Sequence, residues 1–336
     1  MFNVYKTTAN FLLADKLFAK PFTKAVNQAK GSQATFKDLH HAFYAAMAPK
    51  AYFEIKDVEA VHVMAEEVLY YNTGTKIIFP ESEALLDSLR CAKFDLVEGH
   101  PVDFPFESFS VAMPKNYVRD GVEFMPFLVS WMTGDEYRQK ATKPFDKITK
   151  LNITQTTPDT EKQLCLTIMN AESDVKIRFM IGQSALPHVI NAKDAQDFVK
   201  RMKDVEQVHL ADNMTEEDNH IQFCHLRLAV SYAIYNAALG GLKEGLPEIK
   251  IAQNKSQRNQ GYKAFTVANK LKGSAAVGTP QYRPPHFRQL RAERFYRCDE
   301  WINKPRGSRW VYVSDFYVGG GTKAETYTQT DKGEAL

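Results

Sequence analysis

The spacing of the apolar residues changes near residue 100, and this change limits the folds open to the chain. Before it, apolar residues recur every three or four positions, as at Phe36, Leu39, Phe43 and Met47, which is the period of an amphipathic helix. After Gly99-His100-Pro101, segments of strand length alternate or run apolar, with a period near 2. The sequence therefore predicts an α+β fold in which a helical N-terminal region precedes a central, mainly antiparallel sheet.

The same patterns assign ranges to the expected elements. Helices are expected at 10–18, 35–48, 57–71, 80–89 and 194–203, and strands at 104–112, 122–132, 148–156, 163–170, 175–181 and 308–318. The strands 148–156, 163–170 and 175–181 are expected to form an antiparallel meander. A long helix capped by Thr215 and ended by Gly240-Gly241 is apolar on most faces, which predicts a buried core helix.

These elements divide the chain into five expected parts. Residues 1–100 form the helical region, and 101–247 the antiparallel sheet with its long helix. Residues 248–282 contain little apolar material and are expected to be a basic mobile linker. A basic and aromatic segment, 283–327, should pack on the sheet and end in a strand, and 328–336 should be a frayed tail.

Charge is distributed very unevenly along the chain. Between Ile249 and Arg309, 14 basic residues face three acidic ones, a net charge of +11. The whole chain carries only +3, so the remainder sums to −8. A field of this kind steers an anionic partner, and arginine beside aromatic rings suits phosphate, carboxylate or stacked bases. Pairing of these arginines with the acidic remainder of the chain is the alternative.

Composition limits the class of protein. Four cysteines, Cys91, Cys165, Cys224 and Cys298, are far apart without a CxxC pair, which predicts reduced, mostly buried thiols. No apolar run reaches the length of a membrane helix and no signal peptide is recognisable, so no membrane association and a cytoplasmic location are expected.

The motifs tested for chemistry predict neither a metal nor a cofactor. His220 and His225 are five residues apart on the long helix, which turns their rings to different faces. His40-His41 diverge in the same way. Gly319-Gly320-Gly321 follows a strand, but no helix has room to form after it, so a phosphate loop is not expected.

Acidic residues offer two further patterns. The pairs Glu66-Glu67 and Glu216-Glu217 lie on expected helices, where solvent exposure or compensation of the helix N-terminus explains them. A two-metal nuclease would need Asp103, Glu107 and Asp120 to converge, which their spacing does not require.

The segment Arg283-Pro284-Pro285-His286-Phe287-Arg288, followed by Phe295-Tyr296 and by the strand Arg309-Trp310-Val311-Tyr312-Val313, resembles the C-terminal signature of a phage protein family. That family includes the type V-A anti-CRISPR protein that blocks biogenesis of the type V-A effector nuclease. The resemblance extends from Arg283 to Gly319, and implies a phage origin and a role against a host target. It departs from the family where a His-Trp-His cluster is replaced by Arg291, Ala292 and Glu293, so only the roles of His286 and Arg288 carry over.

The leading hypothesis is therefore a phage-encoded binding protein of the anti-CRISPR type. Its expected partner is RNA, a ribosome-associated complex or a host defence protein, and its oligomeric state stays open. The expected binding residues are Arg283, His286, Phe287, Arg288, Arg291, Arg294, Tyr296, Arg306, Arg309 and Trp310, with the aromatic rings stacking or packing on the partner.

Two alternatives stay open. One is a nuclease or nucleotide-modifying enzyme with His286 as its acid–base group, because neighbouring cations would favour the neutral imidazole, and with the nearby arginines stabilising phosphate charge. The other is a purely structural role, in which the arginines are held in internal ion pairs.

Overall fold

The computed structural model describes most of the chain. The described residues are 13–14, 16, 18–28, 38, 41, 58–96, 102–142, 160–169, 176–205, 215–247, 262–270, 281–283, 286–313 and 316–318. The expected helices at 10–18 and 35–48 and the expected strand at 148–156 fall largely or entirely outside these ranges, as do most of the linker and the tail.

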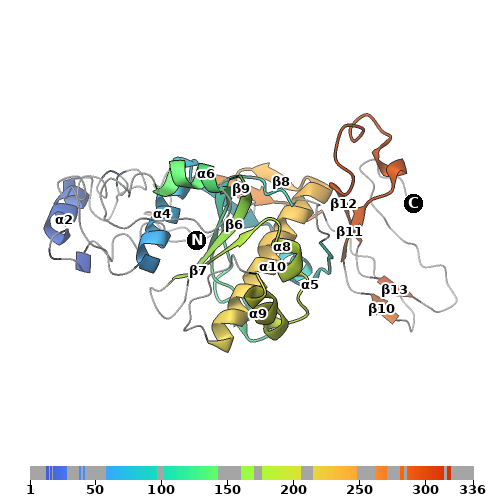
Figure 1. Cartoon of the computed structure of the whole chain (residues 1–336), viewed down its shortest axis with the longest axis horizontal. Helices are drawn as coiled ribbons and strands as arrows, with labels where there is room; N and C mark the ends of the chain where they lie inside the picture. Colours follow the sequence, from blue (N-terminus) through green and yellow to red (C-terminus); the bar gives the residue numbers. More distant parts are fainter. Residues whose placement is uncertain are drawn as a thin grey trace.

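A seven-stranded mixed sheet forms the centre of the molecule (Figure 1). Its strand order is β7-β6-β5-β2-β1-β9-β8. The strands are β1 (Lys76–Pro80), β2 (Ser108–Val111), β5 (Phe127–Thr133), β6 (Lys162–Met169), β7 (Lys176–Gly182), β8 (Leu242–Glu244) and β9 (Lys263–Val267). Four neighbouring pairs are antiparallel, whereas β1 pairs in parallel with both β2 and β9. The α+β class and the mainly antiparallel sheet are thus confirmed.

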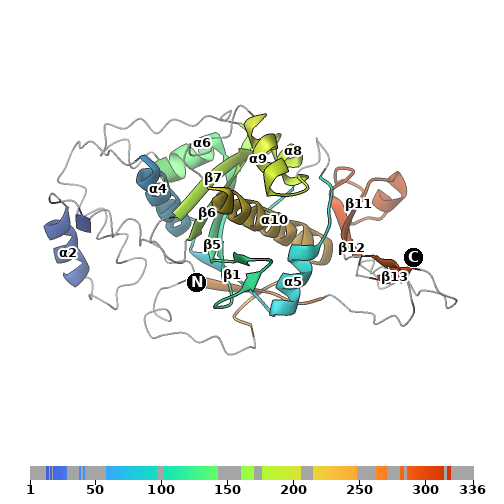
Figure 2. The ribbon, with the colours of Figure 1, turned by 90° about the horizontal axis from the view of Figure 1, so that it is seen from below.

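The described chain also contains helices and short turns. They are α2 (Ala19–Gln28), α4 (Val58–Asn72), α5 (Glu83–Cys91), α6 (Gly134–Tyr137), the π-helical turn η2 (Arg138–Thr142), α8 (Leu186–Ile190), α9 (Ala195–Lys203) and α10 (Glu216–Leu239). Of these, α2 lies apart from the sheet (Figures 1 and 2). A small hairpin, β3 (Val118–Arg119) with β4 (Val122–Glu123), precedes β5. Pro80, expected to open a helix, instead ends β1, and Ser82 caps α5.

The long helix α10 is the core element that the sequence predicts. The side chain of Thr215 accepts a hydrogen bond from the backbone N–H of Asp218 in a capping box, and Gly240 ends the helix in the left-handed conformation with φ 56°. The next residue, Gly241, has no room for a side chain, because a Cβ there would lie 2.9 Å from Cε1 of Tyr235. Residues on most faces of α10 are buried, and the helix packs on the apolar side of β5, β6 and β7, where Leu166 and Phe179 lie.

The opposite side of the sheet is polar and lies under α4 (Figure 2). Glu66 on α4 is 1% exposed and forms an ion pair of 3.0 Å with Arg178 on β7. Ser130 Oγ donates a hydrogen bond of 2.8 Å to Glu66 Oε2, and Arg178 donates one of 3.2 Å to the Tyr137 hydroxyl. The expectation that Glu66-Glu67 is solvent-exposed is therefore wrong: both residues are buried, and an arginine from another element neutralises Glu66.

The expected linker is wrong for Lys263–Val267. This segment is β9, which pairs with β1 over its whole length inside the sheet. Beyond β9, Lys270 Nζ donates hydrogen bonds of 2.7 Å and 3.2 Å to the carbonyls of Leu239 and Gly240, so this part of the chain also closes the end of α10. The residues on both sides of β9 are polar, so composition alone does not indicate this short strand.

The C-terminal hairpin comprises two ladders in one register. In the first, β10 (Gln281–Arg283) pairs with β13 (Phe316–Val318), and in the second, β11 (His286–Leu290) pairs with β12 (Arg309–Val313). Because Arg283 faces Phe316 and His286 faces Val313, the register is unchanged between the ladders. The hairpin lies at the end of the molecule away from α2 (Figure 1).

The hairpin attaches to α10 and to the segment after α5. The ring of Phe287 lies 6.4 Å from that of Tyr235 on α10 and 5.2 Å from that of Tyr312. The backbone N–H of Phe287 donates a hydrogen bond of 2.8 Å to the carbonyl of Lys93. The sequence predicts that this segment packs on the sheet itself. Instead it packs on α10, which is buried on more than one side and contacts the sheet with another of its faces.

Candidate binding surface

The eighteen residues between β11 and β12, 291–308, form a structured lobe (Figure 1). They include the 3-10 turn η3 (Glu293–Tyr296). A connection of this length in a hairpin is uncommon and is usually functional. In both views of the ribbon the lobe projects away from the sheet (Figures 1 and 2).

The hydroxyl of Tyr296 holds the lobe together. It donates a hydrogen bond of 2.7 Å to the carbonyl of Leu290, at the end of β11. It accepts hydrogen bonds of 2.7 Å and 3.0 Å from the backbone N–H groups of Gly307 and Arg309, where β12 begins. One buried phenol thus joins both ends of the lobe.

Trp301 forms the second internal contact of the lobe. Its ring lies 6.2 Å from that of Tyr296 in an edge-on arrangement. Lys304 Nζ lies 4.1 Å from the Trp301 ring and the Arg309 guanidinium 5.3 Å from it. Arg309 also donates a hydrogen bond of 2.8 Å to the carbonyl of Phe295. Arg309 is therefore an internal brace of the lobe.

The expected aromatic contacts with a partner are wrong for Phe287, Tyr296 and Trp310. These side chains are only 4–6% exposed. In β11 and β12, alternate residues point to opposite sides, so Phe287 and Trp310 turn toward α10 while Arg288 turns outward. The aromatic residues fix the hairpin in place, and the surface offered to a partner belongs to the basic residues.

Three arginines on this surface, Arg288, Arg291 and Arg294, are exposed, and we call them the arginine trio. None of them forms an ion pair with an acidic residue in the described part of the chain. Arg291 donates a hydrogen bond of 2.9 Å to Gln289 Oε1, and the Arg294 guanidinium lies 4.8 Å from the ring of Phe295. The charge of the trio is thus not neutralised within the described chain.

Glu293 engages the other exposed arginines. Arg306 approaches it at 3.1 Å and Arg297 at 3.7 Å. All three side chains are more than half exposed, where an ion pair contributes little to stability. Arg306, an expected binding residue, therefore has an ion-pair partner, whereas the trio has none in the described part of the chain.

The remaining expected residues lie beside this surface. His286 is half-buried on β11, where its backbone forms a parallel bridge with Lys93. Arg283 lies on β10 opposite Phe316. Both residues come shortly before the trio in the chain, Arg283 at the end of β10 and His286 at the start of β11.

The other candidate sites do not form. Asp103, Glu107 and Asp120 are in three separate ion pairs, with Lys162 at 3.5 Å, Lys140 at 2.8 Å and Arg90, so they do not converge. Within the ranges described above, no three His, Cys, Asp or Glu side chains gather in a way that would hold a metal ion.

The two histidines of α10 have different surroundings. His220 is exposed, whereas both ring nitrogens of His225 face backbone carbonyls, those of Ile221 at 2.7 Å and Met125 at 3.2 Å. Burial lowers the pKa of His225 to about 4, against the raising effect of the two carbonyls. Burial therefore favours the neutral form of His225 in the core.

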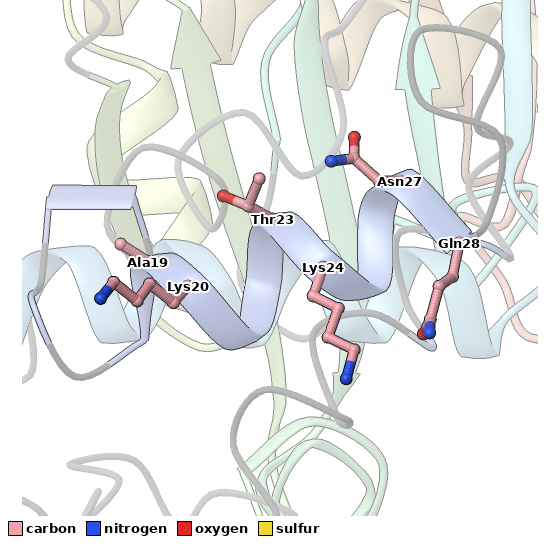
Figure 3. A pocket seen from close by; sticks show the side chains of 6 residues that line it. All are labelled: Ala19, Lys20, Thr23, Lys24, Asn27 and Gln28. Carbon is pink, nitrogen blue, oxygen red and sulfur yellow. The ribbon is translucent and has the colours of Figure 1, made fainter.

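A hollow lies along α2, lined by Ala19, Lys20, Thr23, Lys24, Asn27 and Gln28 (Figure 3). All six lining residues come from this one helix, so the described chain brings no converging groups to it. The cysteines are free; Cys165 is buried and Cys91 exposed. The helices of the described ranges are too short or too polar to cross a membrane.

Comparison with known proteins adds no family assignment. Neither a scan against family models nor searches of curated proteins and solved structures found a match.

Proposed function

We propose that this protein is a binding protein that acts through the arginine trio and the lobe on a partner carrying phosphate or carboxylate groups. The resemblance of residues 283–319 to the anti-CRISPR-containing phage family supports a phage-encoded protein that antagonises a host or defence system. Its place of action is then the cytoplasm of the host cell.

One observation supports this proposal most directly: the lobe is structured, and the arginines of the trio are exposed without an ion-pair partner in the described chain. The Tyr296 hydroxyl and the Trp301 contacts join the ends of the lobe. Arg288 on β11 and Arg291 and Arg294 in the lobe are exposed. A preordered surface loses less conformational entropy when it binds. Exposed guanidinium groups supply strong charge-assisted hydrogen bonds to anions.

The proposal assigns distinct roles to the expected site residues. The arginine trio contacts the partner, and Arg306 lies near enough in the lobe to assist. Phe287, Tyr296, Arg309 and Trp310 hold the hairpin and the lobe in position. An enzyme that uses His286 remains the alternative.

The test is co-purification from infected or host cells. The variant Arg288→Gln/Arg291→Gln/Arg294→Gln removes the trio. A matched control, Lys193→Gln/Lys200→Gln/Lys203→Gln, removes three exposed cations from the α9 region. The proposal expects a partner that is recovered with wild type and control and lost with the trio variant. Equal recovery with all three proteins would refute it.

The enzyme alternative makes a different prediction. It expects that His286→Ala abolishes turnover of a nucleic acid or nucleotide while co-purification of the partner is unchanged. A binding protein instead keeps whatever effect it has on the host when His286 is replaced but the trio is intact.

A further inference from the structure

We infer that the ligand of the arginine trio is the phosphate backbone of single-stranded RNA, bound along the side of the lobe without base-specific contacts. This inference rests on the proposed function and names the partner of the same surface. Four features of the hairpin support it.

The first feature is the type of cation. Between His286 and Arg309 the basic residues are Arg288, Arg291, Arg294, Arg297, Lys304, Arg306 and Arg309, so all but one are arginines. A planar guanidinium binds phosphate oxygens through two parallel N–H groups, which an ammonium group does not do. The residue type is that expected where phosphates are recognised.

The second feature is the lack of an apolar anchor for a protein partner. Ile302, 59% exposed, is the one large aliphatic side chain that stands out on the lobe within its described residues. Protein interfaces depend on aromatic or aliphatic groups that become fully buried at their centre. Here most aromatic rings are already buried inside the hairpin, and Phe295 is partly buried with Arg294 over its ring. The exposed surface is therefore better suited to phosphates than to a protein.

The third feature is the shortage of exposed rings for base stacking between His286 and Val313. Phe295 is only partly buried, and the Arg294 guanidinium lies 4.8 Å from its ring. Phe287, Tyr296, Trp310 and Tyr312 are buried. The ring of Trp301 is also buried and has Lys304 and Arg309 over it. Base stacking on exposed rings is the usual second component of single-strand binding. With at most one partly exposed ring, binding should depend mainly on phosphate contacts and should tolerate different base sequences.

The fourth feature is the position of the acidic residues. Asp299 and Glu300 lie at the midpoint of the lobe and are exposed. If the hairpin entered a duplex groove with its tip first, these carboxylates would approach the phosphates that line the groove. A flexible single strand can contact the exposed arginines without approaching these carboxylates. In the proposed cytoplasmic location, such strands are RNA.

The experiment is a fluorescence-anisotropy titration of the purified full-length protein. The probes are a labelled single-stranded RNA of mixed sequence, a second RNA of different sequence, single-stranded DNA and an RNA duplex. Each is titrated at several salt concentrations with wild type, the trio variant and the Lys193/Lys200/Lys203 control. Near-ultraviolet circular dichroism confirms that each variant keeps its tertiary packing.

The expected result is similar affinity for both single-stranded RNAs, weaker binding of the RNA duplex, and a tenfold or greater loss with the trio variant but not with the control. Each single-strand phosphate contact contributes about 0.7 to the slope of log K against log salt, so the trio variant should lose about 2 from that slope. An unchanged slope in the trio variant would overturn the inference. Preference for the duplex would also overturn it. Single-stranded DNA carries the same phosphates and should bind about as tightly as RNA.

These outcomes separate the inference from the proposed function. If co-purification yields a partner that needs the trio but resists nuclease treatment, and the RNA titrations show no binding, the partner is a protein and only the RNA inference fails. If the trio is dispensable for co-purification as well, both fail.

Discussion

The body of the molecule and the C-terminal lobe are both ordered, but different interactions order them. In the body, α10 buries apolar side chains on one side of the sheet, and α4 covers a buried ion pair on the other. The lobe buries few side chains, chiefly Tyr296 and Trp301, and its ends are joined through one phenol hydroxyl. Its conformation therefore depends on a few polar contacts instead of on a large core.

The use of charge also differs between the two regions. The side chain of Arg178 in the body is 8% exposed and forms an ion pair with Glu66. The arginine trio is exposed, and none of its members forms an ion pair with a carboxylate in the described part of the chain. A buried arginine requires its partner for folding. An exposed arginine costs almost nothing in the free protein, so it is available to bind a ligand. The following predictions test this contrast, beginning with the largest effect.

Removing Glu66 should destabilise the body strongly. Glu66→Ala leaves the buried Arg178 guanidinium without its counter-ion, which typically costs about 3–5 kcal/mol. Urea unfolding measures the loss. The double variant Glu66→Met/Arg178→Met is the control and should be much closer to wild type, because it removes both charges. A loss below about 1 kcal/mol for Glu66→Ala would show that the pair is not needed.

The body should also lose stability in acid through His225. The folded-state pKa is about 4, below the ordinary value of about 6.5, so between these values the unfolded chain binds a proton that the folded chain does not. The free energy of unfolding should therefore fall as pH falls through this window, by about 3 kcal/mol in all. In denaturant titrations at several pH values, His225→Gln should lose this part of the pH dependence. If the free energy of unfolding of the variant falls with pH as steeply as that of wild type, His225 is not buried in its neutral form.

Removing the Tyr296 hydroxyl should loosen the lobe and spare the body. Tyr296→Phe leaves the backbone N–H groups of Gly307 and Arg309 without their acceptor, at a cost of about 1–3 kcal/mol. Amide hydrogen exchange should become faster in residues 291–309 and stay unchanged in α10. Faster exchange throughout the sheet as well would mean that the lobe and the body unfold as one unit.

The sequence predicts the body well where the pattern is local. The capping box at Thr215, the buried length of α10 and the paired strands β6 and β7 follow from residues close together in the chain. The sequence does not indicate the central strands β1 and β9. Pro80, at the end of β1, also fits the first turn of a helix, and β9 is surrounded by polar residues. The ion pair of Glu66 was missed because Arg178 lies 112 positions away.

The site was predicted in part. The segment was located from its charge, but charge alone could not separate the trio from Arg309, which braces Trp301. Neighbouring residues in a strand face opposite sides, so the strand pattern alone indicates that Phe287 and Arg288 cannot both face a partner. The hydrogen bonds of Tyr296 depend on residues at both ends of the lobe, and no spacing rule indicates them.

The most direct test of the central claim is the stability of the trio variant. If Arg288, Arg291 and Arg294 are reserved for a partner, Arg288→Gln/Arg291→Gln/Arg294→Gln should unfold in urea within about 0.5 kcal/mol of wild type, as exposed substitutions usually do. If these arginines are instead held in internal ion pairs with the acidic remainder, the variant should lose several times that amount or fail to fold, and the account of the lobe as a binding surface would be wrong.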